Sequence, residues 1–193
     1  MALSAAADEV LEFWFSTENS ARWFATDVAF DAEIRMRFEN VAADAGAGRL
    51  DDWIETPQSW LALLILLDQF PRNLYRRDPH AWAQDINAQR HALSGIAKGH
   101  DQALPPIWRM FAYLPLEHAE DIGLQQRSVT LFEALCEEAS PAERKQFEGF
   151  FDYARRHCEV IARYGRFPHR NAVLGRVNTP EEIRYLAQPD AGF

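Results

Sequence analysis

The sequence predicts an all-α fold, a compact array of about eight helices, on the basis of three observations. Apolar residues recur at helical spacing, for example Phe30, Ile34 and Phe38. Helix-start signals that combine a capping hydroxyl with a following proline occur several times, for example at Thr56-Pro57. No segment shows the apolar alternation between hairpin turns that is typical of strands.

Length and composition favour one domain over residues 1-193. Hydrophobic residues make up 48% of the chain, and 13 Phe with 6 Trp supply a bulky core. Twenty basic residues against 29 acidic ones give a net charge of −9. General binding to nucleic acid or to an anionic membrane needs a basic face, so we expect neither partner.

We expect a cytoplasmic protein. The N-terminal stretch MALSAAADEVLEF has neither the basic n-region nor the apolar h-region of a signal peptide. Cys136 and Cys158 lack CxxC spacing, which favours buried free thiols in a reducing compartment over a disulfide.

In the first half of the chain, each expected helix has its own start or stop signal. Ser4 can cap a first helix that runs to about residue 15. Gly46 follows a second helix over 27–45. Pro71 must kink or end the central helix that starts at Thr56, because proline supplies no backbone N–H.

Beyond the central helix, prolines again mark the expected boundaries. Asp78-Pro79 should start a helix with Ile86 turned inward, and Pro105–Tyr113 should form a short one. The polar segment 115–121 is expected to form a turn.

Three helices are expected in the rest of the chain. The first carries Ile122 to Leu135. A capping box at Ser140-Pro141-Ala142-Glu143 should open a long helix that Gly165 stops. A second box, Thr179-Pro180-Glu181-Glu182, should start a short helix to about residue 187.

The most informative stretch is Trp60–Arg76, WLALLILLDQFPRNLYR. Its first part is apolar all round, which predicts a helix surrounded by other elements. It is too short to span a bilayer, which needs about 20 apolar residues. Its second part contains side chains that are costly to bury unless they are paired, namely Asp68, Gln69, Arg72 and Asn73.

Two further polar motifs are His118-x-Glu120-Asp121, with Gln125 one turn on, and Arg166-Phe167-Pro168-His169-Arg170-Asn171. Residues 155–176 contain six arginines and one acid, a local charge of +5. Arginine suits the recognition of carboxylate and phosphate, so this cluster indicates a pocket for a small anion. Alternatively, the arginines pair internally with acids such as Asp68, Glu120 and Asp121.

No cofactor and no metal ion is expected. His118, His157 and His169 have acids nearby, and imidazole with carboxylate suits zinc, iron or manganese. However, there is no HExxH, no paired ExxH and no histidine pair at i,i+4. P-loop and GxGxxG motifs are also absent. The apolar stripe around His157 favours a buried core histidine.

For acid–base chemistry, His118 beside Glu120 and Asp121 is the best candidate set. The ordinary pKa of histidine lies near neutrality, which suits proton transfer.

Three segments, LDQFPRN, YLPLEHAEDIGLQQ and YGRFPHRNAVLGR, together resemble the bacterial "domain of unknown function 924" family over nearly the whole chain. The resemblance implies a compact all-helical fold of the tetratricopeptide-repeat-like type, and it implies no established activity. The resemblance also implies that the polar residues of these three segments occupy the motif positions of the family.

We therefore expect a helical bacterial protein that binds a small anionic molecule in an Arg/His-lined pocket. The expected ligand-binding residues are Asp68, Gln69, Arg72, Asn73, Gln125, Arg166, His169, Arg170 and Asn171. Two alternatives stay open. One is a protein-interaction scaffold, with a protein partner or a second copy, whose polar motifs are purely structural. The other is a cofactor-free enzyme that uses His118 as acid or base.

Overall fold

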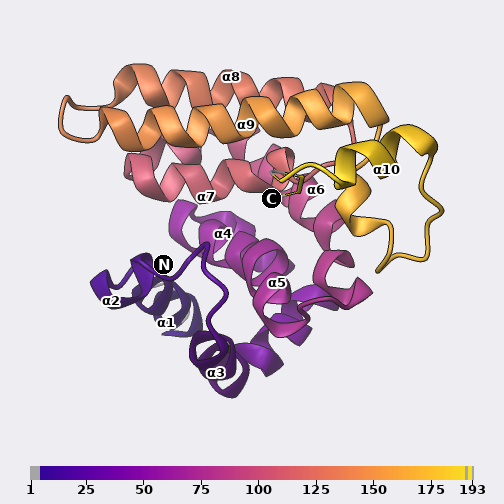
Figure 1. The fold of residues 1–193 in the computed structure, drawn as a ribbon. Helices are drawn as coiled ribbons and strands as arrows, with labels where there is room; N and C mark the ends of the chain where they lie inside the picture. Colours follow the sequence, from indigo (N-terminus) through magenta and orange to yellow (C-terminus); the bar gives the residue numbers. More distant parts are fainter. Residues whose placement is uncertain (1–4, 190, 193) are drawn as a thin grey trace. The chain divides into compact units, whose positions relative to one another are not determined.

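The computed structural model describes residues 5–189, 191 and 192, and these residues form helices and turns but no strand (Figure 1). The all-α prediction is confirmed, while its tetratricopeptide-like part stays a prediction. The chain divides into two compact units, Met1–Arg76 with His80–Pro115 and Arg77–Pro79 with Leu116–Phe193. The single-domain assignment also stays a prediction.

In the first unit, helix α4 (Pro57–Leu64) is the central element. It begins as predicted, because Thr56 Oγ1 accepts from the Ser59 N–H and proline occupies the first turn. Every residue of α4 from Ser59 onward is buried. The helix packs against α1 (Ala5–Trp14) and α6 (Asp85–Ala97). The predicted cap of α1, Ser4, lies outside the described residues.

Helix α6 approaches α4 closely through a small residue. A Cβ atom on Gly95 would lie 2.1 Å from Cε2 of Trp60, and the Trp60 indole donates to the His91 carbonyl at 2.8 Å. Because this indole fixes the inward face of α6, Ile86 faces outward and is 79% exposed. The predicted inward position of Ile86 is therefore wrong.

The predicted start of this helix at Asp78-Pro79 is also wrong. Pro79–Trp82 forms a single 3₁₀ turn, η3, and the α-helix begins only at Asp85. Arg77, between α5 and this turn, has a positive φ of 62°, so its own backbone is not helical.

The central helix widens before Pro71. Ile65–Gln69 forms a π-helical turn, η2, and the chain then continues as α5 (Phe70–Leu74). The Phe70 N–H donates to the Ile65 carbonyl, five residues back. The missing N–H of Pro71 is thus accommodated by a wider turn that the sequence did not predict. Helix α3 (Val28–Gly46) packs against both segments.

Helix α7 (Pro106–Glu117) passes through Pro115, in a segment predicted to be a turn. Leu114, Pro115 and Leu116 are all buried. Their burial outweighs the one backbone hydrogen bond that proline removes from a helix.

The second unit is built on an antiparallel pair, α8 (Ile122–Glu138) and α9 (Arg144–Tyr164), which lie side by side (Figure 1). Asp121 caps α8 by accepting from the Leu124 N–H at 2.9 Å. The predicted capping box at Ser140 is wrong, because the Ser140 hydroxyl bonds to the Glu143 side chain and α9 begins after both. Gly165 ends α9 as predicted, with φ of 68°.

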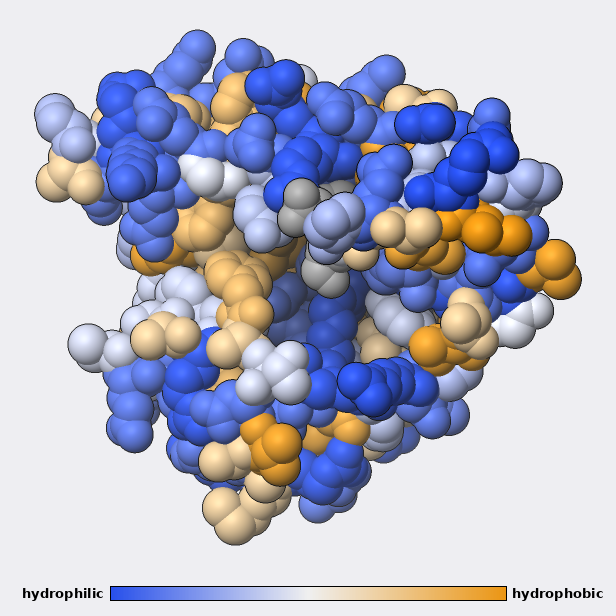
Figure 2. Space-filling model, in the orientation of Figure 1, coloured by the Kyte–Doolittle hydropathy of each residue, from blue (hydrophilic) through white to orange (hydrophobic). Residues whose placement is uncertain are grey.

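The predicted box at Thr179 is confirmed, and it starts α10 (Pro180–Leu186). The remaining short elements are α2 (Thr17–Ser20), η1 (Asp51–Glu55), η4 (Asp101–Ala103) and η5 (Pro168–Arg170). Figure 2 shows a predominantly hydrophilic face with separate apolar patches. No described helix has both the length and the hydropathy needed to cross a membrane.

Candidate functional site

The first polar motif lies in the first unit, where the π-helical turn carries Asp68. The Arg72 guanidinium lies between two buried carboxylates, 3.3 Å from Asp68 and 3.1 Å from Asp85. Gln69 donates to the other oxygen of Asp68. Burial lowers the pKa of Arg72, but the two negative charges outweigh burial and the pKa is raised. This arrangement is a buried ion-pair network.

Asn73 has a similar internal role. Its amide donates to Asp31 Oδ1 of α3 at 2.8 Å. Arg76 pairs with the same carboxylate. The two side chains therefore hold the end of α5 against α3.

The first unit also contains a pocket of about 300 Å³ between α3 and α5. Small apolar residues of α3 form one wall, and the polar side chains at its edge are Tyr75, His80 and Gln84. A volume of this size is at the low end for small-molecule sites. Among the described residues that line it, there is none of the predicted ligand-binding set.

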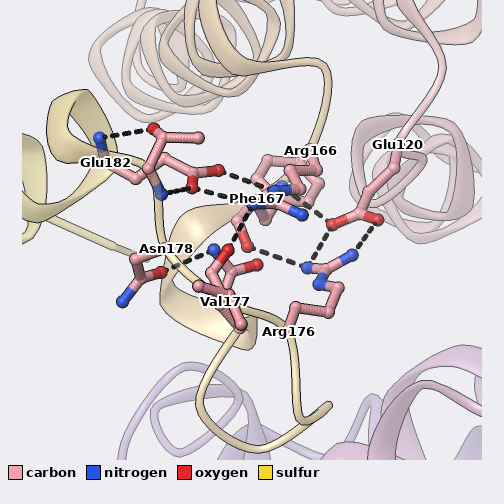
Figure 3. Close-up of polar contacts among 9 residues, drawn as sticks. Glu120, Arg166, Phe167, Arg176, Val177, Asn178 and Glu182 are labelled. Atoms are coloured by element: carbon pink, nitrogen blue, oxygen red, sulfur yellow. Dashed lines mark hydrogen bonds and ion pairs between the residues drawn. The ribbon is translucent and has the colours of Figure 1, made fainter.

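The second and third motifs come together in the second unit (Figure 3). The Phe167 N–H donates to Glu120 at 2.8 Å, and Arg176 makes two bonds to the same carboxylate at 2.6 and 2.9 Å. Arg170 Nη2 donates to the His118 carbonyl at 3.2 Å. Segments about 50 residues apart in sequence therefore form one cluster.

The two acids predicted to orient His118 have other partners in this cluster. Burial raises the pKa of Glu120, but the Arg176 and Phe167 donors outweigh burial and the pKa is lowered. Asp121 caps α8. Both carboxylates therefore have structural roles.

Arg166 also pairs internally. It makes a bidentate contact with the buried Glu182, at 2.6 and 2.8 Å, and donates to the Val177 carbonyl (Figure 3). The bond from Arg166 holds the pKa of Glu182 at about 2. Asn171 donates to Asn178 at 2.6 Å. Arg166 and Arg176 therefore pair with acids inside the protein, which is the alternative to an anion pocket that the sequence left open.

Gln125 is fully buried on α8. Its amide nitrogen donates to the carbonyls of Glu117 and Ala119, at 2.5 and 2.8 Å. Gln125 thereby satisfies carbonyls that the end of α7 leaves without intrahelical donors.

One guanidinium and two imidazoles pack around the aromatic ring of Phe167. The Arg170 guanidinium lies over the ring at 4.4 Å, and the rings of His157 and His169 lie 5.5 and 5.6 Å away. Arg170 is 6% exposed. We call these four residues the Phe167 cluster.

Both imidazoles of the cluster are neutral near pH 7. Burial and neighbouring positive charge, including that of Arg170, lower the pKa of His157 to about 3 and that of His169 to about 4.

Sequence reasoning missed the partner of His157. Its Nδ1 lies 2.8 Å from the Tyr153 carbonyl and 3.2 Å from the Glu117 carboxylate. Glu117 is buried at the end of α7, next to His118. The loss of hydration has the largest effect on the pKa of His157, and it outweighs the bond to the Tyr153 carbonyl, which favours the imidazolium. The one available signal was the position of Glu117 directly before the second motif, within the segment YLPLEHAEDIGLQQ.

Within the described part of the chain, no three His, Cys, Asp or Glu side chains come together as a metal ion would require.

Comparison with known proteins places the chain in a family. The model of a family described as "Bacterial protein of unknown function (DUF924)" matches residues 10–190. A solved structure of a protein of unknown function from Agrobacterium tumefaciens is 40% identical, with a TM-score of 0.85 over 95% of this chain and 97% of that one. No curated protein matches the chain. The chain belongs to the bacterial DUF924 family.

Proposed function

We propose that the protein binds a small anion at the Phe167 cluster, with Arg170 as the cationic group. The observation that carries this proposal is electrostatic. Burial has the largest effect on the pKa values of His157, His169 and Glu120, and the positive charge of the neighbouring Arg170 lowers all three. A positive potential that acts on three surrounding groups favours an incoming anion as well.

The surrounding side chains support this assignment. A guanidinium matches carboxylate and phosphate geometry, and neutral imidazoles add hydrogen-bonding groups without charge repulsion. His118 and His169, which are next to the buried Arg170, are partly exposed.

The proposed site contains fewer residues than the ligand-binding set expected from the sequence. Arg166 and Arg176 bind Glu182 and Glu120, so they hold the loop that carries Arg170 rather than the ligand. An acid–base role for His118 has less support, because Glu120 and Asp121 are engaged elsewhere.

The test is thermal unfolding in the presence of phosphate, with ionic strength matched by sodium chloride. At a phosphate concentration ten times the dissociation constant, the wild type gains about 1.4 kcal/mol. That gain raises the melting temperature by roughly 3–6 °C for a chain of this size. Arg170→Gln should lose the response, whereas Arg155→Gln, an exposed change on α9, should keep it.

The response to phosphate is the readout, so a shift in the basal stability of Arg170→Gln does not affect the conclusion. A wild type that is indifferent to phosphate, sulfate and citrate would refute the proposal. An equal response in Arg170→Gln would refute the assigned position.

A further inference from the structure

We propose that the pocket between α3 and α5 binds a small, uncharged aromatic molecule through a carbonyl oxygen, with the side-chain amide of Gln84 as the hydrogen-bond donor. The pocket lies within the first unit, and none of its lining residues belongs to the Phe167 cluster. The inference is therefore independent of the proposed anion site.

The pocket joins the surface of the first unit to its core. Ala43 and Ala47 are exposed on the α3 side, whereas Pro71 and Leu74 of α5 are buried. The α3 side consists of alanine and glycine alone, so no long side chain from that helix fills the volume of about 300 Å³. Such a lining favours the transfer of an apolar body out of water.

The backbone next to the buried side of the pocket is π-helical. Turn η2 ends at Gln69, just before Pro71, which lines the pocket. Single π-helical turns within α-helices are frequent at functional sites, so the backbone gives separate support to a ligand site here.

Gln84 supplies a directed donor. Its Oε1 accepts from the Asn87 side chain at 2.8 Å, and its Nε2 faces α3. A Cβ atom on Gly46 would lie 3.0 Å from this Nε2, so the amide can lie against the pocket wall because residue 46 is a glycine. No described residue accepts from Nε2. An acceptor oxygen of the ligand would satisfy this donor.

The lining favours an uncharged ligand. Among the described residues, no Asp, Glu, Lys or Arg lines the pocket. The Arg35 guanidinium lies 5.9 Å from the centre of the Tyr75 ring, but it bonds to Glu39 and to the Leu74 carbonyl. A carboxylate or an ammonium group in the pocket would therefore lose hydration without gaining a counter-charge.

The rings of Tyr75 and His80 favour an aromatic body. Both residues line the pocket, and their ring centroids lie 5.6 Å apart. A third ring can pack against them in a stacked or edge-on arrangement. The small volume restricts the ligand to about one ring with short substituents.

The experiment follows alanine methyl resonances of the full chain, because Ala42, Ala43, Ala47 and Ala83 all line the pocket. The probe is acetophenone, which joins a phenyl ring to a carbonyl group. We expect saturable shifts of these resonances, while that of Ala32, exposed on the same helix, stays fixed. Absence of saturable shifts at the pocket alanines would overturn the proposal.

Two charged probes test the class of ligand. Benzoate and benzylamine keep the ring but carry a charge at pH 7, so each should bind at least about tenfold more weakly than acetophenone. Equal or tighter binding of either one would overturn the uncharged class.

Gln84→Leu tests the hydrogen bond. Because the change removes the donor and keeps the bulk of the side chain, affinity for acetophenone should fall about three- to tenfold. Affinity for ethylbenzene, which has the ring but no oxygen, should not fall. Gln89→Leu, a half-buried change on α6 outside the pocket, is the matched control and should leave both affinities unchanged. An unchanged affinity of Gln84→Leu for acetophenone, or an equal loss for both compounds, would overturn the role of Gln84.

A change in the pocket wall tests the position. Ala43→Leu places a larger side chain in the pocket and should weaken acetophenone binding at least about tenfold. Ala32→Leu makes the same change on the same helix outside the pocket and should not. Equal affinities in the two variants would overturn the assigned site.

Discussion

Arg166 and Arg170 are close together in the sequence, yet they have different surroundings. Arg166 makes a bidentate contact with Glu182, which is 2% exposed. Arg170 lies over Phe167 and donates to a backbone carbonyl. Within the local +5 of this segment, Arg166 therefore has a bidentate carboxylate partner, and Arg170 is the cation of the proposed site.

The Arg166–Glu182 pair leads to a stability prediction. Arg166→Gln leaves the buried Glu182 carboxylate without its bidentate partner, so the variant should unfold at lower urea concentration than the wild type. Arg163→Gln, an exposed change at the end of α9, is the control and should leave the midpoint unchanged. A midpoint for Arg166→Gln equal to that of the control would contradict the structural role.

The buried histidines predict a pH dependence. The folded pKa of His157 is about 3 against 6.5 for an ordinary histidine, so below pH 6.5 the unfolded chain binds a proton that the folded one does not. Stability should fall from pH 7.5 to 5.5, by about 1 kcal/mol for this residue.

Urea unfolding at the two pH values measures this difference. His157→Gln should show a smaller loss than the wild type between pH 7.5 and 5.5. A variant with the full wild-type loss would mean that His157 is protonated in the folded protein.

The sequence indicated that His157 is buried, but it did not indicate which residue is the partner of His157. Glu117 lies 40 residues earlier, in a segment that Pro115 made resemble a turn. No periodicity connects residues on two separate helices. The polar motifs could be read from the sequence, whereas the pairing of their members depends on tertiary packing.

At the scale of elements, two nearly identical start signals had different outcomes. Thr179-Pro180-Glu181-Glu182 forms a capping box, with both side-chain-to-backbone bonds. In the corresponding segment, the Ser140 and Glu143 side chains bond to each other, and the helix begins at Arg144. The pattern predicts that a helix starts nearby, but the choice between two local hydrogen-bond arrangements is not encoded in it.

The close approach of α6 to α4 gives a prediction for glycine. Gly95→Ala would place Cβ 2.1 Å from the buried Trp60 indole, so the structure must shift and about 1–3 kcal/mol should be lost. Gly149→Ala is the matched control, because it lies within α9 and its Cβ would meet no atom within 4 Å. It should gain about 0.5–1 kcal/mol. Urea unfolding measures both, and equal midpoints would contradict the packing.

At the scale of the whole molecule, the tryptophans provide a test of the single-domain prediction. All six lie in the first unit, namely Trp14, Trp23, Trp53, Trp60, Trp82 and Trp108. Tryptophan fluorescence therefore reports on that unit, whereas far-UV circular dichroism reports on the helices of both. One cooperative domain should give coincident urea transitions by the two probes, and separate midpoints would show that the units unfold independently.

The proposed anion site in an acidic chain is tested most directly at the Arg170 side chain. Nuclear magnetic resonance can follow its guanidinium while phosphate is added at constant ionic strength. Binding at the Phe167 cluster predicts a saturable shift of the Arg170 Nε–H resonance, with the resonances of exposed arginines such as Arg155 unchanged. An Arg170 resonance that stays fixed, or that moves together with the exposed arginines in proportion to added phosphate, would contradict the site.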